Sequence, residues 1–229
     1  MSTTHFLPLK LNQVNLALNK TPVLNDITLS FNSKGISIIM GSNGSGKTLL
    51  LKCCASLLPP SSGSIEWQQC PTPPKVTWVP QQPVLLDRSV LDNIHLSLAH
   101  HKLQNIEQRC EAALEWANIK YLSDKNAIEL STGEQQLVAL ARAWSLSPSI
   151  LLLDEPIANL DPARRNHINE LIKAMSQSCK IIMTSHSVKQ VQELAAHVIL
   201  LEKGSVVADL PKETFFSSDE YKRFINDHY

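Results

Sequence analysis

Glycine is scarce in this chain, and the place where it gathers predicts a phosphate-binding site. Seven glycines occur in 229 residues, and three of them fall just before Lys47 and Thr48. Glycine is needed where a side chain would obstruct the backbone. Residues 41–48, GSNGSGKT, fit the pattern G-x-x-x-x-G-K-[ST], in which backbone N–H groups, a lysine and a hydroxyl surround phosphate oxygens and Mg²⁺. The ligands expected in this loop are Gly41, Ser42, Asn43, Gly44, Ser45, Gly46, Lys47 and Thr48.

The segments on either side of this loop favour a site over a chance match in a turn. Ile36–Met40 has the continuous apolar character of a buried strand, and residues 48–57 have that of a helix, ended by two consecutive prolines. A loop between a strand and a helix directs its N–H groups and the helix N-terminus toward an anion. Lys47 then adds positive charge near the outer phosphates, and Thr48 offers its hydroxyl to Mg²⁺.

A second anion-binding surface is expected at residues 130–136, LSTGEQQ. Ser131 and Glu134 have the spacing of a capping box, in which Ser131 accepts a hydrogen bond from the backbone of residue 134 and Glu134 reaches back. With Gly133 in the first turn, this helix N-terminus is open to an anion. Alone, the pattern fits an ordinary capped helix equally well.

Two adjacent carboxylates follow the apolar strand in residues 151–156, LLLDEP. The carboxyl ends of parallel strands line the ligand-binding crevice of such sheets, so Asp154 and Glu155 should approach the phosphates. Asp154 suits holding the metal, directly or through water. Glu155 suits polarising an attacking water molecule. An apolar-Asp-Glu string is weak evidence by itself, but it is strong after a phosphate loop and a capped glycine helix.

The remaining pattern predicts an α/β chain with a helical insertion. Apolar and polar residues alternate in residues 9–31 around a turn at 19–22, which indicates antiparallel strands. A proline-rich loop containing Pro71, Pro73 and Pro74 precedes a strand, and helical spacing dominates residues 85–146. Further elements are expected as strands at 76–79, 150–153 and 180–184, a helix from Asp161 and Pro162, and a hairpin of 198–201 with 205–208.

Together these motifs resemble the ATP-binding-cassette (ABC) family of ATPases, and the resemblance covers nearly the whole chain. The family order is phosphate loop, Gln loop, signature, Asp-Glu pair, D-loop and switch histidine. By this resemblance, Gln81 in VPQQP senses the metal and the attacking water, Asp161 ends the D-loop at 158–161, and His186 contacts the γ-phosphate. The resemblance thus implies the catalytic residues Glu155, His186 and Gln81, the metal-binding residues Thr48, Gln81 and Asp154, and further ATP-binding residues Ser131, Thr132, Gly133, Glu134 and Asp161.

The resemblance also implies the fold and the assembly. The expected fold is a P-loop NTPase (RecA-like) parallel-sheet core with an N-terminal antiparallel β subdomain and an inserted α-helical subdomain. One ABC ATPase domain spans 1–229, with 1–84 and 150–229 forming the core and 85–149 the helical signature subdomain. The cofactors are ATP and Mg²⁺. In this family two copies enclose two ATP molecules, each bound by the loop of one copy and the signature of the other, and the resemblance implies the same assembly here, with hydrolysis coupled to transport.

Several positions depart from the usual family pattern. In the signature, Thr132 replaces the first glycine and Glu134 replaces the glutamine, although both keep the cap. Leu18 stands where the family stacks an aromatic ring on adenine, so the base contact should be weakened by about 1–3 kcal/mol if it behaves like other base–aromatic stacking. Ser187 follows the switch histidine where an acidic residue is common.

The sequence favours a separate ATPase subunit of an importer. Three segments of the sequence are similar to the ATPase cassettes of tungstate and molybdate uptake systems. These segments are IMGSNGSGKTLLLK, PQQPVLLDRSVLDNI and KETFFSSDEYKRFI. Importers of phosphate or polar amino acids, a haem-type exporter and a soluble non-transport ABC ATPase remain alternatives. A nucleotide-binding module without turnover is disfavoured because Glu155 and His186 are both present. The implied partners are a second copy, integral membrane permease subunits and, indirectly, a solute-binding protein.

The charge balance and the hydropathy of the sequence limit the cellular locations and the binding partners that we expect for this protein. Lys plus Arg and Asp plus Glu both number 21, so the formal charge is zero and no nucleic-acid footprint is expected. No apolar run approaches the roughly 18–20 residues of a membrane helix, and no export signal is evident. We expect a cytoplasmic protein, peripheral on the inner face of the cell membrane.

Overall fold

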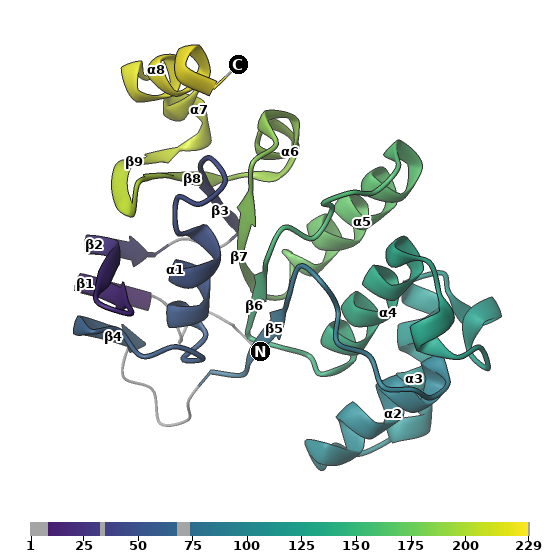
Figure 1. Ribbon diagram of the computed structural model, residues 1–229. Coiled ribbons are helices and arrows are strands. Elements are labelled where there is room, and N and C mark those ends of the chain that lie inside the picture. The colour runs from purple at the N-terminus through teal and green to yellow at the C-terminus, as the bar shows by residue number, and fades with distance from the viewer. Residues whose placement is uncertain (1–8, 33–34, 68–73, 229) are drawn as a thin grey trace.

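The computed structural model describes residues 9–32, 35–67 and 74–228, and a six-stranded sheet forms its centre (Figure 1). The strand order is β5-β6-β7-β3-β8-β9. The strands are β3 (Ile36–Met40), β5 (Val76–Val79), β6 (Ile150–Leu153), β7 (Lys180–Ser185), β8 (His197–Glu202) and β9 (Ser205–Pro211). The first five strands in the spatial order pair in parallel, and β9 pairs antiparallel to β8. The expected parallel-sheet core of a P-loop NTPase is confirmed.

A second sheet and one helix cover one face of this core. The antiparallel sheet has the order β2-β1-β4 and consists of β1 (Leu9–Leu18), β2 (Thr21–Phe31) and β4 (Ser62–Trp67). Helix α1 (Lys47–Cys54) lies between the two sheets, and its apolar side chains share a buried cluster with both. Successive residues of a strand point to opposite faces. Accordingly, Ile39 of β3 joins this cluster, whereas Ile38 and Met40 join the cluster on the other face.

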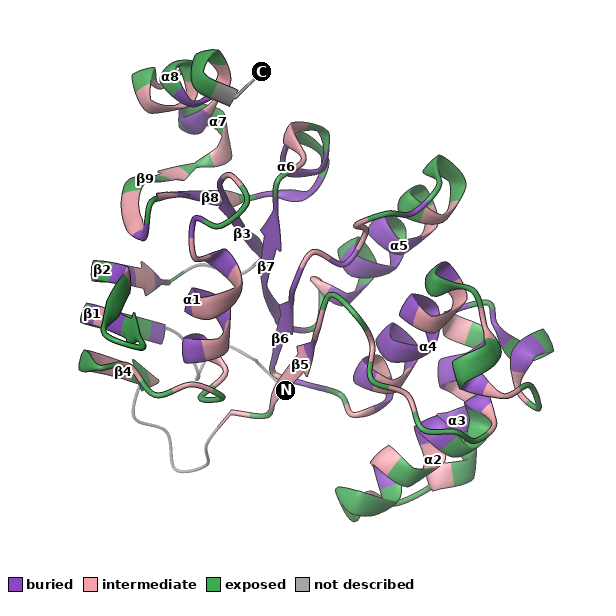
Figure 2. Ribbon diagram, viewed as in Figure 1, coloured by how far each residue is buried: buried purple, intermediate pink, exposed green. Residues whose placement is uncertain are grey.

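The other face is covered by helices, and their buried sides are purple in Figure 2. The helices are α2 (Val90–His100), α3 (Ile106–Trp116), α4 (Thr132–Ser145), α5 (Pro162–Met175), α6 (Val188–Leu194), α7 (Lys212–Phe215) and α8 (Asp219–His228). Two 3₁₀ turns, Lys120–Leu122 and Ala127–Glu129, precede α4.

Helices α2, α3 and α4 pack against one another as a lobe beside the sheet (Figure 1). Trp116 of α3 stacks on Trp144 of α4, with ring centroids 5.2 Å apart and planes 8° from parallel. This lobe is the helical insertion expected from the sequence. Its division from the core at residues 84/85 and 149/150 remains our interpretation, because one apolar cluster runs from the lobe into the sheet.

The structure differs from the sequence-based prediction at α1 and β4, and helices α6, α7 and α8 were not predicted. Helix α1 ends at Cys54 instead of continuing to residue 57, because Ser56 has a left-handed backbone (φ 57°) that turns the chain. Strand β4 was not predicted, although it forms one edge of the antiparallel sheet. Of the expected proline-rich loop, Pro71 and Pro73 lie outside the described residues, and Pro74 directly precedes the segment leading into β5.

Candidate nucleotide-binding site

The candidate site lies where four neighbouring parallel strands end. Strands β5, β6, β7 and β3 are adjacent in the sheet, and their carboxyl ends lead to Gln81, Asp154, His186 and Gly41. Carboxyl ends of parallel strands share one edge, so motifs that are more than a hundred residues apart in the chain meet here. A cavity of about 850 Å³ opens at this edge.

The glycines of residues 41–48 allow close backbone contacts that other residues would prevent. Gly46, the N-cap of α1, has φ 103°, and a Cβ there would lie 2.9 Å from Leu24 Cδ2. At Gly41 a Cβ would collide with the carbonyl oxygen of Leu201. The loop is therefore wedged between β2 and β8, which holds its N–H groups toward the cavity.

The side chain of Lys47 lies inside the loop and is only 5% exposed. Its Nζ donates to the carbonyl oxygens of Gly41 at 3.0 Å and Ser42 at 2.9 Å, and it lies 3.7 Å from Oε1 of Glu155. Burial lowers the pKa of Lys47, while the carboxylates of Glu155 and Asp154 act in the opposite direction. The ammonium is thus held at the centre of the cavity wall by acceptors with which a phosphate would compete.

Asp154 is the hub of a hydrogen-bond network at the end of β6. Its Oδ1 accepts from the hydroxyl of Thr48 at 3.0 Å and from that of Thr184 at 2.7 Å. The Thr184 hydroxyl in turn accepts from the backbone N–H of Glu155 at 2.9 Å. Asp154 is 4% exposed, so this network fixes its carboxylate beside Thr48. The sequence predicted Thr48 and Asp154 but missed Thr184, whose residue type carries no motif signal.

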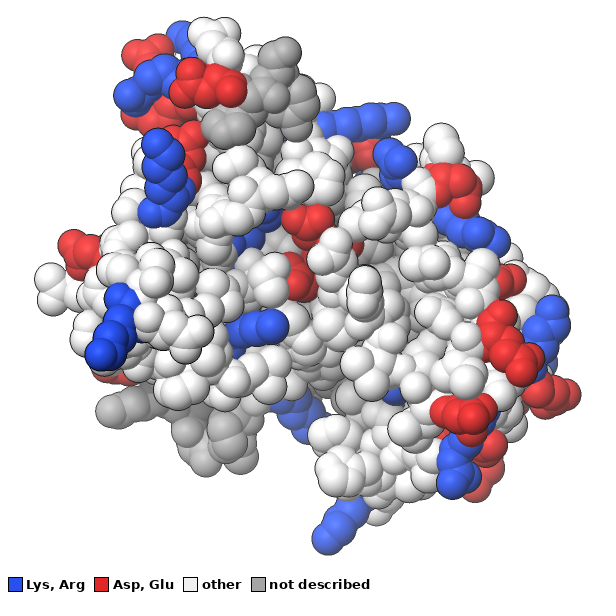
Figure 3. All heavy atoms as spheres, in the orientation of Figure 1, with Lys and Arg blue, Asp and Glu red and all other residues white. Residues whose placement is uncertain are grey.

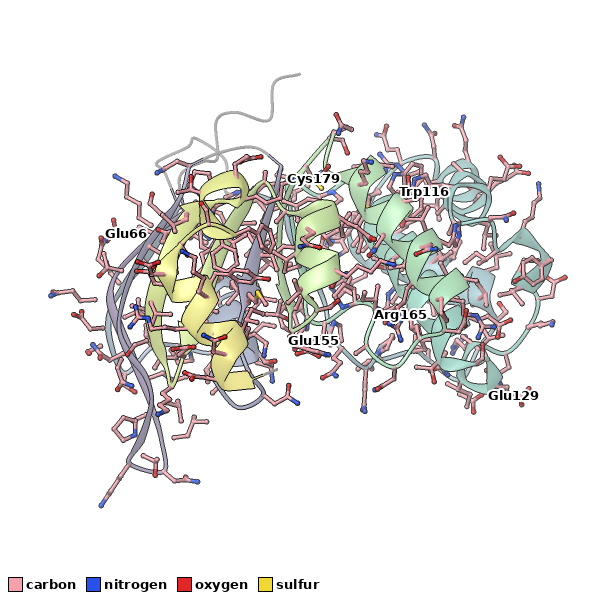
Figure 4. The ribbon with its side chains drawn as sticks, turned by 90° about the horizontal axis from the view of Figure 1, so that it is seen from above. Glu66, Trp116, Glu129, Glu155, Arg165 and Cys179 are labelled. Atoms are coloured by element: carbon pink, nitrogen blue, oxygen red, sulfur yellow. The ribbon has the colours of Figure 1, made fainter. Side chains whose placement is uncertain are left out.

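Glu155 has a strained backbone and a well-placed side chain. Its φ of 42° is uncommon for a residue other than glycine, and such strain often persists at functional sites. Its Oε2 lies 3.1 Å from Nδ1 of His186, and its Oε1 faces Lys47. The structure therefore joins the expected Glu155 and His186 in one contact. Figure 4 shows Glu155 at the middle of the molecule, between the helical lobe and the rest of the chain.

The cavity contains part of the predicted set. The predicted residues that line it are Asn43, Gly44, Gly46, Lys47, Thr48, Gln81, Glu155 and His186. Two further lining residues, Ala158 and Asn159, belong to the predicted D-loop. The lining residues without a predicted role in the site are Pro22, Val23, Leu49, Lys203 and Gly204. Leu18, aligned with the adenine-stacking position, is 40% exposed and is not one of the lining residues.

The signature residues lie apart from this cavity within the single chain. The capping box forms as expected, because the Glu134 carboxylate accepts from the Ser131 N–H at 3.0 Å and from its hydroxyl. These hydrogen bonds from Ser131 are the main cause that lowers the pKa of Glu134. Ser131 and Thr132 are exposed at the start of α4. In Figure 4, Glu129, just before the signature, lies at the far end of the helical lobe from Glu155.

Asp161 is likewise outside the cavity lining. It caps α5, and its Oδ1 accepts from the N–H of Arg164 at 3.0 Å. This backbone hydrogen bond is the main cause that lowers the pKa of Asp161. The predicted N-cap role is confirmed, and the predicted contact with nucleotide stays a prediction.

The oxygen atoms of Thr48 and Asp154 suit a hard cation that takes its remaining ligands from phosphate and water. Within the described residues, no group of three or more His, Cys, Asp and Glu side chains could hold a metal ion by itself. Thr48 and Asp154 supply a hydroxyl and a carboxylate 3.0 Å apart. Mg²⁺ is commonly bound by one or two protein oxygens together with phosphate oxygens and water, so this pair fits Mg²⁺ bound with a nucleotide.

A parallel sheet with a glycine loop between a strand and a helix defines the class of P-loop nucleotide-binding proteins. Within that class, the chain belongs to the ABC transporter family, whose sequence profile matches residues 24–158. It is 32% identical over 208 residues to the molybdenum import ATP-binding protein ModC of Methylococcus capsulatus, covering 85% of this chain and 58% of that protein. It is 36% identical over 191 residues to the tungstate uptake system ATP-binding protein TupC of Peptoclostridium acidaminophilum, covering 80% and 89%.

Solved structures support the same family. The cbiO1 protein of Clostridium perfringens, part of the ABC transporter complex cbiONQ, has a TM-score of 0.82 at 27% sequence identity, covering 97% of this chain and 96% of that chain. The present chain spans little more than half of the ModC relative, 58%, but most of the TupC relative, 89%. In residues 9–32, 35–67 and 74–228, no helix combines the length and apolar character needed to cross a bilayer.

Proposed function

We propose that this protein is the ATP-hydrolysing subunit of an ABC importer. The observation that carries the proposal is the position of the Glu155 carboxylate, between Lys47 and His186 in a cavity bordered by the phosphate loop. A phosphate-binding lysine, a carboxylate and a histidine in contact form an arrangement that supports hydrolysis of a terminal phosphate. A module that only bound nucleotide would not need the last two.

Each site residue has a role in this proposal. The backbone N–H groups of residues 41–48 and the Lys47 ammonium bind the phosphates, and Thr48 and Asp154 hold Mg²⁺, which neutralises charge on the phosphates when bound. Glu155 accepts the proton of the attacking water. His186 orients the Glu155 carboxylate and reaches the terminal phosphate, while Gln81 lies at the cavity wall to position the water.

Two copies of the chain complete the proposed site. Ser131, Thr132, Gly133 and Glu134 lie at the start of α4 in the helical lobe and are not among the residues that line the cavity of their own chain. A second copy, turned to face the first, brings its signature and its Asp161 to the ATP in the first copy's cavity. ATP then joins the copies, and hydrolysis separates them.

An exposed apolar loop after Gln81 supports a membrane permease as the partner. Val84 is 72% exposed and Leu86 is 47% exposed, yet their backbone is anchored. Arg142 donates to the carbonyl oxygen of Val84 at 3.0 Å, and Asn93 both donates to the carbonyl oxygen of Leu86 at 3.1 Å and accepts from its N–H at 2.8 Å. Contiguous apolar surface often marks a docking site, and in this proposal Val84 and Leu86 form part of such a surface. This surface is next to Gln81, so movement of the partner reaches the site directly.

The relatives favour molybdate or tungstate as the solute. ModC and TupC carry molybdenum import and tungstate uptake in their names, and we extend that oxyanion class to this chain. A solute-binding protein and the permease select the solute, and the ATPase attaches to the cytoplasmic face of the permease. On the face shown in Figure 3, Lys and Arg side chains are intermixed with Asp and Glu side chains.

Reconstitution with the permease and the solute-binding protein tests the proposal. ATP turnover in the vesicles is measured with the binding protein and, separately, tungstate, molybdate, sulfate, phosphate or an amino acid. We expect tungstate or molybdate to stimulate turnover most. Stimulation by phosphate or an amino acid alone would contradict the solute assignment, and failure of the chain to co-purify with a polytopic membrane protein would contradict the transport role.

A further inference from the structure

We propose that Arg164 is a positioning residue that couples the signature turn to the end of the D-loop. The inference rests on the proposed function, in which both segments act on the nucleotide held by the partner copy. Arg164 makes the two segments approach that nucleotide as one unit. Three observations place it between them.

The first observation is its attachment to Asp161. Arg164 lies in the first turn of α5, where its backbone N–H donates to Asp161 Oδ1 at 3.0 Å. Its guanidinium Nη1 also lies 3.6 Å from Asp161 Oδ2. Both the backbone and the side chain of Arg164 therefore engage the last residue of the D-loop.

The second observation is that the side chain of Arg164 lies over Gly133. A Cβ added to Gly133 would collide with Arg164 Cδ and lie 3.0 Å from its Nε. Gly133 is not among the residues with positive φ, so backbone conformation does not demand glycine here. A side chain at position 133 would displace the Arg164 side chain, which in this structure lies against the first turn of α4. This contact joins two helices whose N-termini carry the signature and the D-loop residue.

The third observation is the charge of Glu134. The nearby Arg164 contributes, after the hydrogen bonds from Ser131, to lowering the pKa of Glu134. A cation is disfavoured at a helix N-terminus, so Arg164 needs anions beside it, and Asp161 and Glu134 supply them. Glu134 stands where the family signature has an uncharged glutamine. Glu134 therefore adds a second carboxylate to the electrostatic surroundings of Arg164, beside the Asp161 carboxylate.

The neighbouring arginine shows that this arrangement is specific to Arg164. Arg165 directs its Nε to the carbonyl oxygen of Leu160 at 2.6 Å, within its own segment. Arg164 is 43% exposed and Asp161 49%, so their ion pair adds little to folding stability. Its removal should therefore alter activity rather than the melting temperature.

The test compares Arg164→Ala, Arg164→Lys, Glu134→Gln and the double variant Arg164→Ala/Glu134→Gln. The matched control is Arg223→Ala, which removes another exposed arginine from an i,i+3 pair, with Glu220, on α8. ATP turnover is measured for each purified chain with Mg²⁺, and ATP-dependent dimerisation is measured for the same variants in a Glu155→Gln background. Binding of a fluorescent nucleotide to the monomer reports on the chain's own phosphate loop.

We expect Arg164→Ala to lower kcat and weaken the ATP-dependent dimer by about three- to tenfold, a typical coupling between contacting groups. Lysine should restore part of the loss, whereas KM, monomer nucleotide binding and melting temperature should stay at wild-type values. The double variant should be little worse than Arg164→Ala alone, since both changes break the same link.

An Arg164→Ala chain that matches Arg223→Ala in kcat and dimerisation would overturn the inference. Additive losses in the double variant would overturn the link through Glu134. If the Glu155→Gln chain with Arg164 intact does not dimerise with ATP, the proposed two-copy function fails first, and the inference fails with it.

Discussion

At the scale of single residues, Lys47 is held in place before any phosphate arrives. Its ammonium binds two loop carbonyl oxygens and faces the Glu155 carboxylate, and it is almost completely buried. A buried charge without partners would be costly, so these acceptors keep the side chain extended toward the cavity. The loop is therefore preorganised, and phosphate oxygens would replace oxygen atoms that already contact the Lys47 ammonium.

Replacing Lys47 with alanine should greatly weaken nucleotide binding. The change removes a charged donor to the phosphates, which corresponds to a loss of about 10- to 100-fold in affinity. Titration with a fluorescent ATP analogue measures the effect, and Lys173→Ala, at an exposed position of α5, serves as the control. An unchanged dissociation constant for Lys47→Ala would refute the assignment of the loop.

Replacing Glu155 with glutamine should separate binding from turnover. Glutamine has the same shape and the same backbone demands at φ 42°, but it cannot accept the proton of the attacking water. We expect turnover to fall at least about 100-fold while ATP stays bound. Single-turnover hydrolysis and filter binding on the same sample measure both quantities. Normal hydrolysis by this variant would mean that another group is the base.

Sequence motifs identified the residues that act through their chemical type, and missed those that act through their location. Lys47 and Glu155 belong to patterns of fixed spacing, so they were found. Thr184 and Lys203 were not, because Thr184 matters through its distance to Asp154 and Lys203 through a hairpin that reaches the cavity. Such contacts between distant strands leave no local signal.

At the scale of elements, a polar row crosses the sheet near the end opposite the cavity. Lys180 Nζ donates to Ser37 Oγ at 2.8 Å, Ser37 Oγ lies 3.3 Å from His197 Nδ1, and His197 Nε2 lies 2.6 Å from an Asp209 oxygen. The row thus joins β7, β3, β8 and β9. Lys180 is 4% exposed, and burial lowers its pKa to about 8.

The buried Lys180 in this row predicts that the free energy of unfolding of the protein rises with pH. The folded pKa of Lys180, about 8, is below its model-compound value of 10.5, so the unfolded chain binds more protons between these values. Burial of the charge destabilises the fold fully below pH 8, and this cost disappears as pH rises toward 10.5. The total gain is on the order of 3 kcal/mol.

The comparison of wild type with Lys180→Met tests this prediction. Urea unfolding at pH 7, 8, 9 and 10 gives the difference in free energy of unfolding, and we expect wild type to gain on the variant as pH rises. Lys173→Met, at an exposed position, controls for general effects of pH. Parallel stability curves for wild type and Lys180→Met would contradict the lowered pKa.

Prediction of the elements succeeded where the sequence has a continuous apolar run or a helix-capping residue, and it failed where a contact between distant segments decides the structure. The continuous apolar runs of β3 and β6 and the N-cap of α5 were recognised. Strand β4 was not, because its short segment pairs with an irregular β1 in which Gln13 has a left-handed backbone. A Cβ at Gly63 would collide with the Gln13 carbonyl oxygen, so β4 depends on a contact with a distant strand.

At the scale of the whole molecule, one chain contains two separated parts of the proposed site. The cavity lies at the carboxyl edge of the sheet, and the signature lies on the helical lobe. Two facing copies therefore contain two sites, each made of one cavity and the other copy's signature. Variants that damage different parts should then complement each other when mixed.

We expect Lys47→Ala and Ser131→Arg chains, each in a Glu155→Gln background, to dimerise with ATP only when mixed. Alone, the first lacks a cavity that binds ATP, and the second blocks every signature with a bulky side chain. In the mixture, the intact cavity of the Ser131→Arg chain meets the intact signature of the Lys47→Ala chain. Pull-down through a tag on one chain, with and without ATP, measures the association. The matched control mixes Ser131→Arg with a Lys47→Ala/Ser131→Arg chain, which leaves no complete site, and it should not associate. Equal recovery in both mixtures would show that ATP does not join the signature of one copy to the cavity of another.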